Sequence, residues 1–290
     1  MRFLMILRNS GMAALAAASL VLGGQAARAQ DVVPAARDAL PQEIRAAGVL
    51  KIATSLQWAP FAYKSESGAM VGIDISLMTL LSAKLGLKPE FEDIKFPSIV
   101  PGVSTGRYDV GVNQIGITQE RAKVVDFVPY FNSGYGLLVR AGRKDVDINH
   151  LCGRSLALTQ GSAQIAIAEE LSAKCVADGQ EAITMTFYPN SADTYMAVAN
   201  GRGDGFMTAK AVGVHIARGN AKLEMTEPVL PGRMTLSGIV IAKGRTALQQ
   251  ALTLALENAL ADGSYGALMA EFGVSDGALS LEQIQNPPQF

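Results

Sequence analysis

The chain of 290 residues is rich in apolar residues and nearly neutral, with 49% hydrophobic residues, 18% charged residues and a formal net charge of −1. This composition predicts a folded protein of roughly two domains and excludes a disordered chain. It also excludes a protein that binds nucleic acid through a basic surface, so we expect no nucleic-acid partner. Two cysteines and two histidines leave little material for a metal site, and we expect neither a metal nor a cofactor.

The first 29 residues have the three-part pattern of a secretory signal peptide. Arg2 and Arg8 precede an apolar run over residues 11–24, and the segment closes on Ala27-Arg28-Ala29, a small-x-small cleavage signature. The alternative, a membrane anchor, would need roughly 20 apolar residues. We therefore expect cleavage before Gln30 and a periplasmic mature protein. Loss of the three arginines of the signal leaves 22 basic against 26 acidic residues, so the mature chain is mildly acidic.

Export makes the two cysteines informative. An oxidising compartment favours a disulfide between Cys152 and Cys175. The alternative is a pair of buried free thiols. A catalytic thiol is disfavoured because no motif ties either histidine to a cysteine.

From Val49 onward, short strand-like runs alternate with helical patterns. The predicted strands are 49–54, 90–96, 109–115, 135–140, 155–160, 183–188, 205–208 and 238–243. The predicted helices are 73–85, 162–177, 192–200, 211–217 and a long one that runs from Thr246 to Asp262-Gly263. Asp74 is expected to cap the first helix. This alternation predicts an α/β fold with largely parallel sheets.

Motifs of enzymes are weak in this chain. Residues 102–106 match G-x-S-x-G, but a helical stretch precedes them and a strand follows, which is the reverse of a nucleophile elbow. We interpret them as a helix end with a glycine cap. Residues 201–206 lack the last glycine of a dinucleotide-binding loop and precede a strand. His150 and His215 are interpreted as surface or packing residues.

Four groups of motifs follow one another between about Val49 and Gly273. They are LKIATSLQWAPF at 50–61, GIDI at 72–75, the stretch from GRYDV through ITQER to VDF and PY within 106–130, and a last group with LCG at 151–153, QGS at 160–162, GRGD at 201–204 and ADGSY at 261–265. In this order and spacing they resemble the family 3 solute-binding proteins, which are periplasmic receptors of polar amino-acid ABC importers.

The resemblance implies a two-lobed α/β periplasmic binding protein of type II, with two crossover hinge strands and a ligand cleft between the lobes. The crossovers are expected near 132–139 and 231–239. After the signal peptide at 1–29, lobe one would then be discontinuous, at 30–134 and 233–290, and lobe two would span 135–232.

The resemblance also implies ligand contacts. Arg121 stands where the family clamps the ligand carboxylate, for which a planar guanidinium is suited; the alternative is a surface salt bridge. Trp58 and Phe96 stand where the family places aromatic rings on either side of the ligand, although isolated aromatics more often belong to a core. The remaining expected contacts are the strand segment Asn113, Gln114 and Ile115, and the helix start Gly161, Ser162 and Ala163, whose N–H groups would face the carboxylate.

Three positions depart from the pattern of the family. Ser55 and Ala209 occupy positions where amino-acid receptors of the family carry aspartates for the α-ammonium, and Gly116 replaces a serine or threonine that helps hold the carboxylate. A buried ammonium without a carboxylate partner is costly. The ligand is therefore expected to lack a conventional α-ammonium, or to carry a substituted amine against Trp58 through cation–π attraction.

The leading hypothesis is a monomeric, non-enzymatic receptor that binds an amino acid or related small carboxylate and delivers it to an ABC permease in the inner membrane. One alternative is an enzyme similar to cyclohexadienyl dehydratases on the same scaffold, which would need a positioned general acid. The other is a sensory binding protein that reports to a separate membrane partner.

Overall fold

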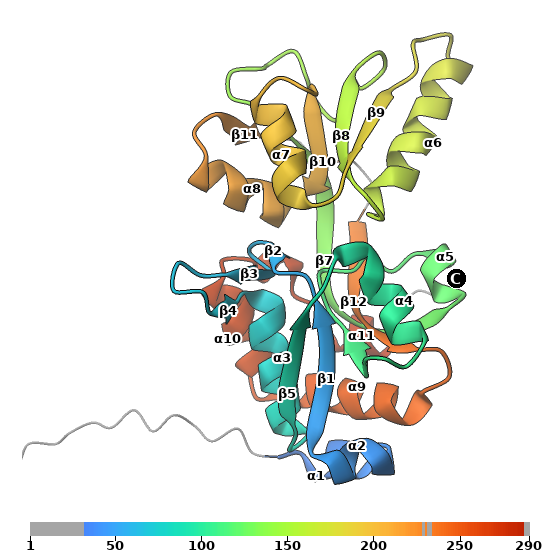
Figure 1. Cartoon of the computed structure of the whole chain (residues 1–290), viewed down its shortest axis with the longest axis vertical. Helices are drawn as coiled ribbons and strands as arrows, with labels where there is room; N and C mark the ends of the chain where they lie inside the picture. The colour runs from blue at the N-terminus through green and yellow to red at the C-terminus, as the bar shows by residue number, and fades with distance from the viewer. Residues whose placement is uncertain (1–31, 228–229, 231–233, 287–290) are drawn as a thin grey trace, which may run out of the picture.

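The computed structural model describes residues 32–227, 230 and 234–286, and the predicted signal peptide lies outside them. This part of the chain forms two lobes of sheet and helix, which lie one above the other in Figure 1. The long strand β7 (Val125–Arg140) runs from one lobe into the other. Within these described ranges, no helix has both the length and the apolar character that a membrane crossing requires.

The lower lobe in Figure 1 is built on a sheet with strand order β5-β1-β6-β12-β7. Its strands besides β7 are β1 (Val49–Thr54), β5 (Lys88–Asp93), β6 (Val110–Gly111) and β12 (Met234–Ala242), and a small second sheet holds β2 (Gln57–Trp58), β3 (Ala62–Lys64) and β4 (Met70–Val71). Its helices are α1 (Pro34–Asp38), α2 (Gln42–Ala47), α3 (Ile73–Lys84), α4 (Ile99–Ser104), α5 (Gln119–Ala122), α9 (Thr246–Ala261), α10 (Ser264–Glu271), α11 (Leu281–Gln285) and the 3₁₀ turns η1 (Phe96–Ser98) and η2 (Ser275–Gly277).

The upper lobe continues the same sheet in the order β7-β10-β8-β9, and β11 pairs with β7 off this path. Its strands are β8 (Ser155–Thr159), β9 (Thr184–Tyr188), β10 (Gly205–Ala209) and β11 (Leu223–Met225). Its helices are α6 (Gln164–Ala177), α7 (Ser191–Ala199) and α8 (Lys210–Gly219). Strand β8 pairs in parallel with both β9 and β10, as expected for strands separated by helices.

Each lobe has an apolar core of its own, to which its helices contribute buried side chains. Leu77 and Leu81 of α3 and Leu252 of α9 are fully buried in the lower lobe. In the upper lobe, Leu156 of β8 and Ala168 of α6 are buried in a separate cluster. The four-residue spacing of Leu77 and Leu81 places both side chains on the face of α3 that packs into the core.

Strand β7 exchanges its antiparallel partners at one point. Up to Gly134 it pairs with β12, and from Tyr135 it pairs with β10. We therefore propose to divide the lobes between residues 134 and 135, with lobe one at 30–134 and 233–290. The predicted second crossover begins at residue 231, and residues 231–233 lie outside the described part of the chain.

The two G-R-x-D motifs of the sequence, at 106–109 and 201–204, make the same hydrogen bond in the two lobes. In lobe one, Asp109 Oδ2 accepts a hydrogen bond from the Lys51 N–H at 2.9 Å, near the start of β1. In lobe two, Asp204 Oδ2 accepts one from the Ser155 N–H, also at 2.9 Å, at the start of β8. Each motif thus ties a strand start to the turn that follows a helix, and its aspartate has a structural role.

Several predicted boundaries are wrong. The strand expected over 135–140 is the end of β7, which begins ten residues earlier at Val125, and the strand expected over 238–243 begins at Met234. Three other boundaries are wrong for a local reason. The strand expected to reach Phe96 ends at Asp93, because Pro97 cannot donate to a ladder and the chain turns into η1. The strand expected over 109–115 is only Val110–Gly111, because the backbone at Gln114 has a φ of 46°. Helix α6 begins at Gln164, not Ser162, after a turn in which the Ser162 N–H donates to the Thr159 carbonyl.

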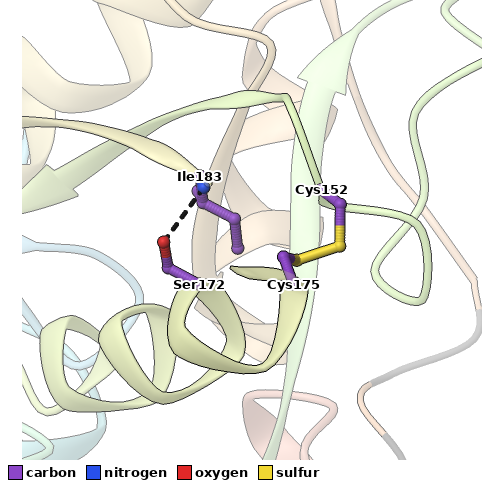
Figure 2. The surroundings of a disulfide bond; sticks show 4 residues. All are labelled: Cys152, Ser172, Cys175 and Ile183. Carbon is purple, nitrogen blue, oxygen red and sulfur yellow. Dashed lines mark hydrogen bonds between the residues drawn. A yellow bond between two sulfur atoms is a disulfide. The ribbon is translucent and has the colours of Figure 1, made fainter. Parts of the chain in front are cut away.

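The predicted disulfide is confirmed: Cys152 and Cys175 are bonded, with their Cα atoms 5.5 Å apart. Figure 2 shows that the bond joins α6 to the segment that leads into β8. Close to it, the Ile183 N–H donates to Ser172 Oγ at 3.0 Å, so the segment before β9 is attached to the same helix.

Removing the disulfide is expected to lower the free energy of unfolding by about 3 kcal/mol, because the bond restricts the unfolded chain over a separation of 23 residues. We would compare urea unfolding of the oxidised protein with that of the variant Cys152→Ala/Cys175→Ala. The reduced wild type should match the variant. Equal stability of all three would show that the bond adds nothing to folding.

Candidate functional site

A cavity of about 300 Å³ lies between the lobes, within the range of small-ligand pockets. Ten of the residues predicted from the sequence line it: Ser55, Trp58, Phe96, Asn113, Gln114, Gly116, Arg121, Ser162, Ala163 and Ala209. They come from both lobes, so the cavity depends on how the lobes meet. Their contact with a ligand stays a prediction.

Arg121 is held at the cavity by local helix geometry. It lies in α5, whose N-cap Thr118 accepts a hydrogen bond from the Arg121 N–H at 3.2 Å. The guanidinium donates from Nη1 to the Gly116 carbonyl and from Nη2 to the Gly161 carbonyl, both at 2.7 Å. Gly116 belongs to lobe one and Gly161 to lobe two. Arg121 is therefore a direct bridge between the lobes.

The electrostatic state of Arg121 suits an anion. Its two hydrogen-bond partners are neutral carbonyls, and a guanidinium has five N–H donors, so donors remain for a ligand. Burial lowers the pKa of Arg121 from its usual value, but the group stays a cation near neutral pH. The Phe96 ring lies 6.0 Å from its Cζ and shields it on one side.

A hydrogen-bonded chain fixes the lobe-one wall of the cavity. Trp58 Nε1 donates to Gln114 Oε1 at 2.8 Å. The Gln114 N–H in turn lies 2.9 Å from Asp74 Oδ2 and 3.0 Å from Tyr130 Oη. Tyr130 donates to Asp74 Oδ1 at 2.5 Å. The unusual positive φ of Gln114 is thus held by a buried carboxylate and a buried phenol.

Asp74 does not cap α3, which corrects the sequence-based expectation. The N-cap is Gly72, and Asp74 lies inside the first turn with its side chain fully buried. Burial raises the pKa of Asp74 to about 7, against the lowering effect of hydrogen bonds from Tyr130 and Gln114. Asp74 thus supports the cavity wall from behind Gln114 and does not line the cavity itself.

The raised pKa of Asp74 predicts a pH dependence of stability. Between about pH 4 and pH 7 the folded chain holds a proton on Asp74 that the unfolded chain has released, so the free energy of unfolding should fall as pH rises, by at most on the order of 4 kcal/mol. Urea unfolding across this range would measure the slope.

The matched variant for this prediction is Asp74→Asn, which cannot titrate. His215, whose pKa is lowered by burial, acts in the opposite direction near its usual pKa, and its effect cancels in the difference between wild type and variant. A difference that does not change with pH would contradict the assignment.

Two predicted site residues lie elsewhere. The Ile115 side chain is buried in an apolar cluster with Ala53 and Val103, and the Ile115 carbonyl accepts a hydrogen bond from the Gly238 N–H at 2.9 Å. Ile115 therefore does not line the cavity, which corrects the prediction for its side chain. Gly161 is also outside the lining and contributes its carbonyl to Arg121.

Lobe two contributes an unused polar atom. Ser162 lines the cavity, and its buried Oγ has no hydrogen-bond partner in the described structure. A buried hydroxyl without a partner is costly, so a ligand oxygen or nitrogen at this point would be favoured. Helix α6 starts two residues later, with Ala163 as its N-cap.

Other lining residues were not predicted from the sequence. They are Gln57, Asp93, Ile94, Lys95, Ser133, Tyr135, Thr159, Gln164, Pro189, Asn190, Ser191, Thr235 and Ser237. Most have neutral hydrogen-bonding side chains, and they come from strands, turns and helix starts. One group had a signal in the sequence, because Pro189, Asn190 and Ser191 follow the predicted strand that forms β9.

Asp93 is the acidic residue among those that line the cavity, and both of its oxygens already have protein partners. Its Oδ1 accepts a hydrogen bond from the Leu56 N–H at 3.0 Å, and its Oδ2 lies 3.6 Å from Lys64 Nζ. With 37% of its side chain exposed, Asp93 lies at the solvent edge of the cavity. Within the described residues, no cluster of histidine, cysteine, aspartate or glutamate is arranged to hold a metal ion.

The sequence matches one family model and several characterised binding proteins. The model of the bacterial extracellular solute-binding proteins, family 3, matches residues 50–275. The arginine-binding protein ArgT of Corynebacterium glutamicum is 25% identical over 264 residues, which cover 89% of this chain and 85% of that protein. The ABC transporter glutamine-binding protein GlnH of Bacillus subtilis is 26% identical over 217 residues, or 73% of this chain and 76% of that protein.

Solved structures share the architecture. An ancestral arginine-binding protein bound to glutamine matches with a TM-score of 0.71 and 28% identity, over 78% of this chain and 98% of that one. An ancestral amino acid-binding protein described as a precursor of cyclohexadienyl dehydratase matches with a TM-score of 0.70 and 27% identity, over 79% of this chain and 97% of that one.

Proposed function

Because the chain belongs to the bacterial extracellular solute-binding proteins of family 3, we propose that the interlobe cavity holds a small carboxylate against Arg121. The family match confirms the resemblance that the sequence motifs indicated, and the similar solved structures confirm the two-lobed type II fold. The protein is a substrate-binding protein of an ABC importer that binds an amino acid or related small carboxylate.

The position of Arg121 is the observation that carries this proposal. Its half-buried guanidinium joins the carbonyls of Gly116 and Gly161 across the two lobes and keeps free donors beside the cavity. A carboxylate matches the fork of a guanidinium, because its two oxygens can accept two parallel N–H hydrogen bonds. A ligand bound there would contact both lobes and would favour their closed arrangement over an open one.

The proposed function also implies a permease as partner and a location outside the cytoplasmic membrane. Relatives of this chain are named as ABC transporter binding proteins, and family members are extracellular or periplasmic. We propose that the mature protein is a periplasmic monomer that delivers its ligand to a permease of the inner membrane. The predicted signal peptide at 1–29 would direct its export.

We propose that the ligand is bound without chemical conversion. An enzyme would need a general acid that reaches the substrate. Asp74 has a suitable pKa but lies behind Gln114, and Asp93 is engaged at the solvent edge. The likeness to a precursor of cyclohexadienyl dehydratase makes turnover the appropriate alternative to test.

A thermal-shift screen tests the proposed function. The panel contains L-arginine, L-glutamine and L-histidine, with 5-guanidinopentanoate and 4-carbamoylbutanoate as deaminated counterparts of the first two. A compound at about 100 times its Kd should add about 2.7 kcal/mol of stability and raise the melting temperature clearly. Stabilisation by a panel member that is absent in Arg121→Gln supports the proposal, and a panel without any stabilising compound contradicts it.

A further inference from the structure

The absence of a side chain at Gly116 leaves a specific space beside Arg121. A Cβ atom built at Gly116 would lie 3.0 Å from Thr235 Cγ2, 3.4 Å from Ala163 Cβ and 3.7 Å from Tyr135 Oη. The Tyr135 hydroxyl therefore lies close to the Cβ position of a serine or threonine at 116, within reach of the hydroxyl that such a side chain would carry. The Gly116 carbonyl is also the acceptor for Arg121 Nη1, so the hydroxyl and the guanidinium share this corner of the cavity.

Tyr135 is firmly positioned there. It is the first residue of β7 that pairs with β10, opposite Ala209, and it is 3% exposed. Its carbonyl accepts a hydrogen bond from the Leu230 N–H at 2.7 Å. Its side chain lines the cavity together with Arg121 and Thr235. A buried phenol with this anchoring needs hydrogen-bond partners inside the cavity.

The phenol of Tyr135 keeps its proton. A side-chain hydrogen bond with Thr235 acts to lower the pKa of Tyr135. Burial is the larger effect and raises the pKa of Tyr135 above its usual value, so the phenol is protonated near neutral pH. A phenol both accepts and donates, so its own O–H can serve a second acceptor.

We propose that Tyr135 donates a hydrogen bond to the ligand carboxylate beside Arg121 and so replaces the hydroxyl that Gly116 lacks. The inference rests on the proposed function, because it takes the anion at Arg121 to be a carboxylate. It assigns a ligand contact to the strand that crosses between the lobes. Arg121 supplies the charge and Tyr135 supplies a neutral donor from a second direction.

The first test uses acetate as a minimal carboxylate, independent of the identity of the natural ligand. In protein labelled with ¹³C at tyrosine Cζ, acetate should shift the Tyr135 signal saturably, and that signal is identified by its loss in Tyr135→Phe. Arg121→Gln should abolish the shift of the Tyr135 signal. A Tyr135 signal that does not respond to acetate would overturn the proposal.

The second test measures affinity by calorimetry with the panel compound that binds most tightly to the wild type. Tyr135→Phe keeps the ring and removes the hydroxyl, and it should weaken binding roughly ten-fold, the loss of about one good hydrogen bond. Tyr63→Phe is the matched control, because Tyr63 is in the small sheet and outside the cavity lining. It should bind like the wild type.

A rescue variant separates a ligand contact from a structural effect. Gly116→Ser/Tyr135→Phe/Thr235→Ser returns a hydroxyl to position 116 and removes the methyl group that a Cβ there would approach at 3.0 Å. It should recover most of the affinity lost in Tyr135→Phe. Unchanged affinity in Tyr135→Phe, or no recovery in the rescue variant, would refute the role of Tyr135.

The outcomes for Tyr135 and for the proposed function are distinguishable. If acetate shifts Tyr135 but no panel compound binds, the proposed function fails and the carboxylate contact stands. If a panel compound binds through Arg121 and Tyr135→Phe affects neither that compound nor acetate, the contact fails and the function stands.

Discussion

Replacing Arg121 with lysine is expected to weaken binding of a carboxylate ligand roughly ten- to hundredfold. Loss of a charge-assisted hydrogen bond costs about 1.5–3 kcal/mol. Lysine keeps the positive charge, but a single ammonium cannot reach the Gly116 and Gly161 carbonyls and the ligand as a planar fork does. The variant therefore loses both the carboxylate clamp and the bridge between the lobes. Calorimetric titration with the tightest panel compound measures the change.

The control for this prediction is Arg107→Lys. The Arg107 side chain is 68% exposed and pairs with Glu92 on the surface, away from the cavity lining. Exposed pairs contribute little, so this variant should bind like the wild type. Equal affinity of Arg121→Lys and the wild type, with the fold intact by circular dichroism, would remove Arg121 from the binding site.

A deaminated ligand is expected to bind roughly five- to hundredfold more tightly than the matching α-amino acid. Ser55 and Ala209 both line the cavity and are almost fully buried, so neither supplies a negative charge where an α-ammonium is expected. Asp93 is engaged with Leu56 and Lys64 at the solvent edge. A buried donor without a partner costs about 1–3 kcal/mol. Titration of L-arginine and 5-guanidinopentanoate under identical conditions measures the ratio.

Ala209→Asp supplies the charge that this account says is missing. The variant should shift preference toward L-arginine, whereas Asp93→Asn in the wild-type background should leave the ratio of the two affinities unchanged. Tight binding of L-arginine by the wild type with no binding of 5-guanidinopentanoate would mean that another group neutralises the ammonium. A loss of that binding in Asp93→Asn would then identify Asp93 as that group.

The sequence predicted the broad fold because its signals are local and repeated. Strand β1 has the predicted bounds, and the leucines of α3 and α9 turn inward as their spacing indicates. The cysteine pair was also predictable, since compartment and composition favour it. The small sheet of β2, β3 and β4 was not predicted, because strands of two or three residues have no measurable periodicity.

Site residues that belong to a sequence motif could be predicted. Site residues that reach the cavity only through the packing of the folded chain could not. Arg121 and Trp58 belong to recognisable stretches and line the cavity. Asp74 was misplaced because an aspartate near a helix start usually caps it, whereas here the turn at Gly72 already begins the helix. Tyr135 gave no signal in sequence, because its role depends on the space that Gly116 leaves across the cavity.

The central claim is that the cleft binds a small carboxylate reversibly through Arg121. The most direct measurement is calorimetric titration of the purified mature protein with the panel, followed by mass spectrometry of the compound recovered after denaturation. We predict saturable binding of one molecule per chain, loss of that binding in Arg121→Gln, and recovery of the compound unchanged. A chemically altered product, or equal binding by Arg121→Gln and the wild type, would contradict it.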